Sequence, residues 1–237
     1  MVASAAELRE LLERRFPGSG LALMPEHERI KSGVDALDEL LSGGLRLGTL
    51  TLLSGGLSCG KTSLAQAFAA HMSRQQGMVA WLHGGSFSAP SVAAAGVDLD
   101  CLLQVRVRGD RQWRECLDVL LRDAAFTLVI ADFLPLQRRS PNWQRVRRLL
   151  VARPCALLLL AAPPAFADPL RDVASVHLHV SRCWSDVPGA EHIEVLLERS
   201  RCSSAGARLQ LPYGVQDFSF LLAPELPGLG QDWNEEF

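Results

Sequence analysis

The chain has 237 residues, of which 48% are hydrophobic and 21% charged, and its formal net charge at pH 7 is −2. This length fits one α/β domain with terminal extensions, and the near-neutral charge excludes a protein drawn to DNA by its overall charge. No apolar run reaches the roughly 18 residues that a membrane helix needs. The N-terminus fits neither a secretory signal nor a transit peptide, and the six cysteines form no C-x-x-C pair. We therefore expect a reduced, cytoplasmic protein with no membrane partner, zinc site or disulfide framework.

The two ends of the chain differ from its middle. Leu8, Leu11 and Leu12 lie on one face of a predicted N-terminal helix that ends near Phe16, and a polar linker follows. Residues 222–237 are rich in proline, glycine and acid, a composition typical of a flexible tail. The predicted organisation is an N-terminal helix and linker over residues 1–30, a core over 31–221 and an acidic tail over 222–237.

The core alternates strands and helices. After a short helix over 34–41, apolar runs predict strands at 48–55, 78–83, 102–107, 126–132 and 155–161, with helices at 61–76, 111–124 and 142–152. Residues 84–101 are expected to form a loop. From Val173 onward the pattern changes to apolar–polar alternation, at 173–180, 192–199 and 207–213, with no helices between. This order predicts an α/β fold with a mostly parallel central sheet flanked by helices and an antiparallel C-terminal edge. We expect strand 126–132 beside strand 48–55.

A phosphate-binding motif joins strand 48–55 to the following helix. Gly55, Gly60, Lys61 and Thr62 fit the pattern G-x-x-x-x-G-K-T, in which backbone N–H groups and a helix N-terminus meet phosphate oxygens. We expect Lys61 to contact the β- and γ-phosphates of the nucleotide. The Thr62 hydroxyl and the Asp132 carboxylate, which ends the strand 126–132, are expected to bind Mg²⁺. The predicted ligand is ATP or ADP with Mg²⁺, not tightly bound. The remaining residue assigned to this site is Ser63.

The order of these motifs resembles the RecA family over roughly residues 5–220. The stretch "IKSGVDALDELLSGGLRLGTLTLLSGGLSCGKTSLAQAFAA" is similar to the opening segment of RecA, and "GVDLDCLL" and "LVIAD" are similar to later RecA motifs. The resemblance implies a RecA-like P-loop core. It also implies that the N-terminal helix could serve in oligomerisation or partner binding.

The chain departs from RecA where RecA carries its catalytic glutamate. That position falls on Gly85 or a neighbour, and no acid lies between Met78 and Val97. The loop offers His83, Ser86 and Ser88; His83 is either a strand-end residue or a replacement base. The segment "PSVAAAG" also lacks the tyrosine that RecA places against adenine. Because hydrolysis needs a group that orients and deprotonates water, we expect at most a weak or vestigial ATPase.

Arginines mark two further candidate contact regions. The first follows the Asp132 strand and carries Trp143 among its arginines, so the arginines could hold phosphates and the tryptophan could stack on a base. This region can be a DNA contact, a protein-binding face or a solvated helix face. Its members are Arg138, Arg139, Arg145, Arg147 and Arg148. The second resembles the K-x-K of RecA that reaches the nucleotide of the next protomer. It consists of Arg199 and Arg201, which are either such a contact or exposed strand charges.

These departures make the chain most similar to the ImuA family, the RecA-like accessory proteins of bacterial damage-induced (SOS) mutagenesis. The resemblance implies a role in translesion synthesis, nucleoid association during DNA damage, and two partners: RecA, and ImuB together with an error-prone C-family polymerase. Weak single-stranded DNA binding and self-association stay open. Two alternatives remain: an active RecA- or RadA-like DNA-dependent ATPase in repair, and an adaptor whose phosphate loop is a relic.

Overall fold

The computed structural model describes residues 28–85, 87–132, 142–162, 170, 173–184, 191–200 and 205–212. Several sequence predictions fall outside these ranges. They concern the N-terminal helix, the acidic tail, Ser86, Arg138, Arg139 and Arg201.

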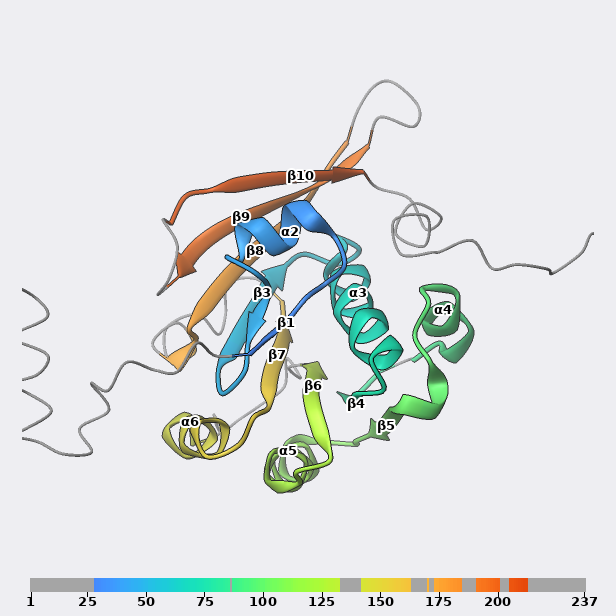
Figure 1. The fold of residues 1–237 in the computed structure, drawn as a ribbon, viewed down its shortest axis with the longest axis vertical. Coiled ribbons are helices and arrows are strands. Elements are labelled where there is room, and N and C mark those ends of the chain that lie inside the picture. Colours follow the sequence, from blue (N-terminus) through green and yellow to red (C-terminus); the bar gives the residue numbers. More distant parts are fainter. Residues whose placement is uncertain are drawn as a thin grey trace, which may run out of the picture.

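An eight-stranded sheet forms the centre of the described chain, in the order β10-β9-β8-β3-β7-β6-β4-β5 (Figure 1). Strands β8, β3, β7, β6, β4 and β5 pair in parallel, whereas β9 and β10 pair antiparallel. This arrangement confirms the predicted α/β fold with a mostly parallel sheet and an antiparallel edge. The strands are β3 (Leu50–Gly55), β4 (Met78–His83), β5 (Leu102–Arg106), β6 (Phe126–Asp132), β7 (Ala156–Ala161), β8 (Val176–Cys183), β9 (His192–Ser200) and β10 (Arg208–Pro212).

Two details of the predicted strand order are wrong. Strand β7 lies between β3 and β6, so residues 126–132 do not pair with the strand of the phosphate motif. Strand β8, expected to be antiparallel, runs parallel to β3, and the antiparallel part begins at β9. Strands β6 and β7 are both continuous apolar runs, so their composition does not distinguish which one occupies the position beside β3.

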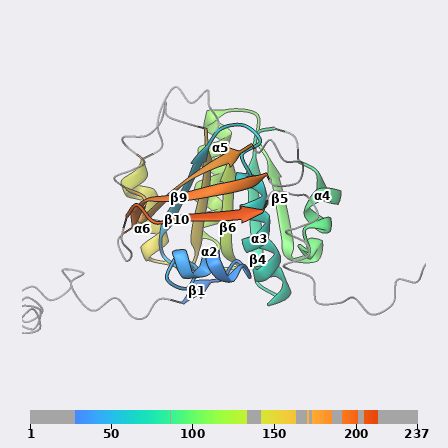
Figure 2. The ribbon, with the colours of Figure 1, turned by 90° about the horizontal axis from the view of Figure 1, so that it is seen from above.

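Helices cover both faces of the parallel strands. The sheet therefore separates two apolar layers of the core. Helices α2 (Asp35–Leu40), α3 (Lys61–Arg74) and α4 (Ala89–Ala94) pack on one face, against side chains such as Leu53 and Trp81. Helices α5 (Asp110–Arg122) and α6 (Trp143–Val151) pack on the other, against Leu52 and Leu159. Figure 2 shows β10 at the near edge of the sheet with α5 behind the strands.

Four short elements were not predicted. Helix α4 and the 3₁₀ turn Leu99–Cys101 occupy the segment that was expected to be a loop. Ser88 caps α4 by accepting from the Ser91 amide, but six residues are too few to show a helical period. The two-residue strands β1 (Arg29–Ile30) and β2 (Leu45–Arg46) also pair, which places the end of the expected linker on the core.

A chain of polar side chains crosses the otherwise apolar strands next to the phosphate motif. The Ser54 hydroxyl lies 2.8 Å from His177 Nε2 and 3.2 Å from His179 Nδ1, and His177 Nδ1 lies 2.9 Å from a Glu198 oxygen. A neutral His177 that donates to Glu198 accepts from Ser54. Serine hydrolases use the same order of groups. Here Ser54 is only 9% exposed in a strand paired on both sides, so the chain of hydrogen bonds joins β3, β8 and β9 rather than presenting a nucleophile.

Candidate nucleotide-binding site

The phosphate loop connects β3 to α3 and packs tightly against the neighbouring strands. A Cβ atom at Gly55 would lie 2.2 Å from the Val180 carbonyl oxygen, and one at Gly60 would lie 2.3 Å from Ile193 Cδ1. Gly60 also has a φ of +99°, which side chains disfavour. Gly55 is therefore required by the close approach of the β8 backbone, and Gly60 by its left-handed backbone conformation. Both leave the backbone of the loop available to phosphate.

Lys61 begins α3 and turns back over the loop. Its Nζ donates to the carbonyl oxygens of Gly55 and Gly56, at 2.6 and 2.5 Å. The first turn of this 14-residue helix contains no acidic residue, so nothing there opposes an anion at the helix N-terminus. The ammonium group, the loop amides and the helix end together fit the phosphates of a nucleotide.

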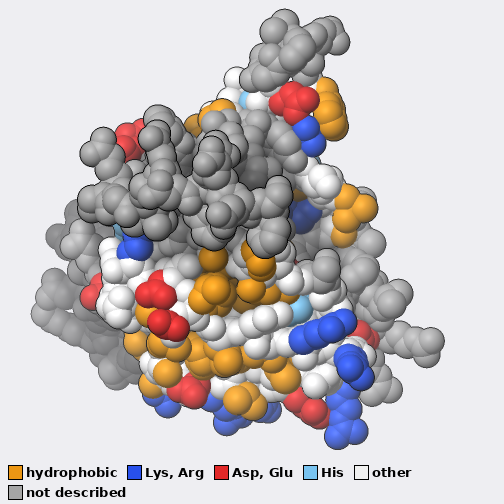
Figure 3. Space-filling model, turned by 90° about the vertical axis from the view of Figure 1, so that its right-hand side faces the viewer, with side chains coloured by type: hydrophobic (Ala, Val, Ile, Leu, Met, Phe, Trp, Pro, Cys, Tyr) orange, Lys and Arg blue, Asp and Glu red, His pale blue; other side chains and the backbone are white. Residues whose placement is uncertain are grey.

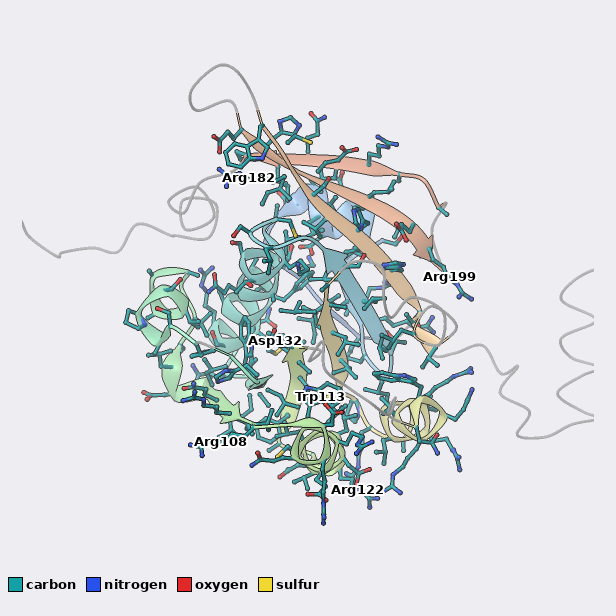
Figure 4. All side chains as sticks on the ribbon, turned by 180° about the vertical axis from the view of Figure 1, so that it is seen from behind. Arg108, Trp113, Arg122, Asp132, Arg182 and Arg199 are labelled. Carbon is teal, nitrogen blue, oxygen red and sulfur yellow. The ribbon has the colours of Figure 1, made fainter. Side chains whose placement is uncertain are left out.

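Asp132 ends β6 at the same edge of the sheet, close to the loop, as expected for parallel strands. Burial raises the pKa of its carboxyl group to about 6, against the opposing effect of the Lys61 charge. Trp113 Nε1 donates to the Asp132 carbonyl oxygen at 2.8 Å, which fixes the strand end (Figure 4).

Thr62 and Asp132 line one cavity of about 250 Å³. A hydroxyl and a carboxylate are the hard oxygen ligands that Mg²⁺ uses together with nucleotide phosphates, so these residues fit the predicted metal. Among the described residues, no cluster of three histidine, cysteine or acidic side chains could hold a metal without such a ligand.

The rest of this cavity is aromatic and neutral. Trp81, Phe87, Gln66, Ser88 and Ser91 are among its other lining residues, and Asp132 is the one carboxylate that lines it in the described part of the chain. Phe87 was not predicted as a site residue, because it precedes the segment after Pro90 in which RecA carries its aromatic side chain. Phe87 lies two residues before α4 and packs edge-on to Trp81, with ring centres 5.6 Å apart.

His83 lies at the end of β4 with both ring nitrogens engaged. Nδ1 lies 3.0 Å from the Gly85 carbonyl oxygen and Nε2 lies 2.9 Å from the Gln104 amide nitrogen. This pattern assigns the proton to Nδ1 and makes Nε2 an acceptor. The side chain is 1% exposed and its ring stacks on Phe87. In this geometry neither nitrogen can take a proton from water, which favours the structural interpretation of His83.

The comparisons with known proteins agree with this architecture. A family model described as "ATPase: KaiC" matches residues 30–80. The RecA protein of Nostoc punctiforme is 37% identical over 106 residues, which cover 44% of this chain and 30% of that protein. The RecA protein of Crocosphaera subtropica is 34% identical over 127 residues, covering 51% and 36%. The crystal structure of the RadB recombinase superposes with a TM-score of 0.66 at 19% identity, over 79% of this chain and 97% of the other.

The chain therefore has a RecA-like fold and carries the sequence motif of a P-loop. The matched part spans about a third of the length of the RecA relatives.

The RecA-like arrangement separates Arg199 from the phosphate loop of its own chain. Ile193, at the start of β9, touches the Gly60 position, whereas Arg199 pairs with His177 near the other end of the strand. At about 3.3 Å per residue this separation is about 20 Å, and Figure 4 shows Arg199 well away from Asp132. This separation favours the expected contact of Arg199 with a nucleotide bound to another molecule over one bound to its own chain.

The arginines of α6 form part of the packing between helices. Arg145 makes two hydrogen bonds to Asp118 on α5, at 2.8 and 3.1 Å, and Arg122 bonds the same carboxylate. These contacts, led by Arg145, lower the pKa of Asp118. Trp143, which was expected to be able to stack on a base, is buried together with Val146 and Leu150. The stacking part of that hypothesis is wrong, and the described arginines that remain exposed on α6 without such a bidentate pair are Arg147 and Arg148.

Proposed function

We propose that this chain is a nucleotide-binding accessory protein of damage-induced mutagenesis and translesion synthesis, whose phosphate loop binds ATP or ADP with Mg²⁺ but hydrolyses ATP slowly or not at all. The observation that supports this proposal is the cavity beside Thr62, in which Asp132 is the one lining carboxylate among the described residues. Asp132 is suited to hold the metal, and His83 has both nitrogens occupied. Among the described residues, the site thus keeps its binding groups and offers no second carboxylate or free imidazole nitrogen that could deprotonate water.

Different residues of the chain would bind the phosphates and the metal. The loop amides and Lys61 would hold the phosphates, while Thr62 and Asp132 would orient the metal, which offsets phosphate charge when bound. Phe87 and Trp81 give the cavity an apolar wall. Partners implied by the ImuA-like pattern are RecA and the ImuB accessory with its polymerase, reached through the chain ends. None of the described helices has the length and apolar content to span a bilayer.

A nucleotide titration followed by a turnover assay tests this proposal. We expect saturable binding of ATP and ADP that Lys61→Ala abolishes, with turnover reduced by about 10² to 10⁴ relative to an enzyme that has a general base. Brisk turnover stimulated by single-stranded DNA and lost in Lys61→Ala would instead support an active DNA-dependent ATPase. The "ATPase" in the family description favours that second candidate.

A gain-of-function variant tests whether only the base is missing. A Cβ atom at Gly85 would meet no other atom within 4 Å, so a larger side chain can be introduced there. We expect Gly85→Glu to raise turnover, whereas Gly85→Gln, which has nearly the same size but no carboxylate, should not. Equal turnover in the two variants would show that more than a base has been lost.

A further inference from the structure

Two strongly exposed apolar side chains border the phosphate loop. Leu57, in the loop itself, is 98% exposed, and Trp184, just beyond β8, is 72% exposed. These are the highest exposures among the large hydrophobic residues in the described part of the chain. Single exposed apolar residues are common on protein surfaces, but a leucine and a tryptophan on either side of one ligand loop form a candidate contact surface.

The antiparallel pair β8–β9 brings Trp184 to this place. Gly55 pairs with Val180, and β8 continues past this point to Cys183. Trp184 therefore lies about 13 Å beyond the end of β3 along the strand direction, at about 3.3 Å per residue. On the returning strand, Ile193 touches the Gly60 position. A molecule that covers both Leu57 and Trp184 must therefore touch the phosphate loop.

Trp184 is held in a defined orientation. The Arg182 guanidinium lies 3.8 Å above the centre of its ring, and Arg182 in turn forms an ion pair with Glu191 at the start of β9. Figure 3 shows hydrophobic, basic and acidic side chains together at this end of the sheet. Because Trp184 and Arg182 are already ordered in the free protein, these side chains lose less conformational entropy when a partner binds. Tryptophan and arginine are also the residues that most often dominate protein interfaces.

The charges of this surface favour a second copy of the chain over a nucleic acid as the partner. Arg182 and Glu191 form an ion pair, so this pair adds no net positive charge for a nucleic acid backbone. One cation and one anion side by side are instead complementary to a second copy of the same surface turned through 180°, in which each arginine faces the other copy's glutamate. The two apolar anchors are self-complementary in the same way.

We propose that the rim formed by Leu57, Arg182, Trp184 and Glu191, the Leu57–Trp184 rim, is the contact surface of a two-fold symmetric dimer of this chain. Each copy covers the phosphate loop of the other. The dimer is expected to form without nucleotide as well. Where the proposed function also holds, nucleotide and dimer are linked, and each changes the affinity for the other by the same factor.

Sedimentation of the full-length chain from low- to high-micromolar concentration tests the dimer. We expect a discrete monomer–dimer equilibrium whose dissociation constant rises about tenfold or more in Trp184→Ser, as for a central interface residue. Val119→Ser on α5 and Val151→Ser on α6 are matched controls, because their valines are 63% and 64% exposed on helices away from the rim. These controls should leave the equilibrium unchanged.

Four outcomes would overturn the proposal. They are a monomer at every concentration, a dimer that Trp184→Ser does not weaken, a control that weakens it equally, and growth beyond the dimer, which indicates a head-to-tail contact. Circular dichroism of each variant establishes that it is folded. Leu57→Ser is the second variant, and it keeps the test decisive if Trp184→Ser does not fold. If Trp184→Ser instead lowers the affinity for a single-stranded oligonucleotide and leaves the sedimentation unchanged, the rim is a nucleic acid contact and the dimer is wrong.

Discussion

The raised pKa of Asp132 links metal binding to stability. A carboxyl group whose pKa rises from 3.8 to about 6 on folding adds stability that is complete below pH 4 and is lost as the pH rises through 6. Its ionised form therefore costs about 3 kcal/mol at pH 8. We expect Asp132→Asn to raise the free energy of unfolding of the nucleotide-free protein at pH 8 more than at pH 5. It should also weaken the Mg²⁺-dependent part of nucleotide binding at pH 8.

Chemical denaturation at both pH values, combined with nucleotide titration with and without Mg²⁺, measures these effects. The wild-type Mg²⁺-dependent affinity should fall as the pH is lowered through about 6, because the protonated carboxyl cannot bind the metal. An equal effect of Asp132→Asn on stability at both pH values would show that this carboxyl is already ionised at pH 5.

Ser54 provides a second prediction at the scale of single residues. Ser54→Ala removes the hydroxyl between His177 and His179 and leaves their facing ring nitrogens without this partner. The cost of such a loss inside a protein is about 1 to 3 kcal/mol. Urea unfolding should therefore show a destabilisation in this range. A change below about 0.5 kcal/mol would mean that another group or water replaces the hydroxyl.

At the scale of elements, the contact between α5 and α6 distinguishes Arg145, which holds the two helices together, from the exposed arginines that could contact DNA. Charge reversal of Arg147 and Arg148 leaves the Arg145–Asp118 pair intact. If the exposed arginines bind phosphates, this double variant should lower the affinity for single-stranded DNA and reduce the log–log salt slope by about 0.7 per lost contact. Arg145→Gln is the control for loss of the helix pair. An unchanged slope in the double variant would assign these arginines to solvation alone.

The sequence predicted those elements in which local pattern and chemistry agree. The apolar run before Gly55, the glycine spacing and the helix after Lys61 were sufficient for the phosphate loop. The position of β7 was not predictable, because lateral strand order depends on packing between runs of the same composition. The partners of His83 were also missed, since Gln104 lies on another strand and Gly85 contributes a carbonyl group. Phe87 could have been found by including the residues directly after β4 in the search for an aromatic.

At the scale of the whole molecule, the two chain ends are the proposed partner-binding segments. On the predicted N-terminal helix, Leu8, Leu11, Leu12 and Phe16 would form an apolar face suited to a groove. In the sequence, Trp233 and Phe237 lie among acids near the C-terminus. We expect deletion of residues 1–16 to weaken RecA binding and deletion of residues 223–237 to weaken ImuB binding. Pull-down with purified partners measures both. Unchanged binding by both folded truncations would place the interaction on the core.

The chemical state of bound nucleotide tests the central claim most directly. Full-length protein in excess over radiolabelled ATP with Mg²⁺ is incubated for several hours without removing free nucleotide, and the labelled nucleotide is identified at intervals. A site that binds phosphates but has no group to deprotonate water predicts that the label is recovered as triphosphate, with no binding in Lys61→Ala. Recovery as diphosphate within minutes, accelerated by single-stranded DNA, would contradict the account.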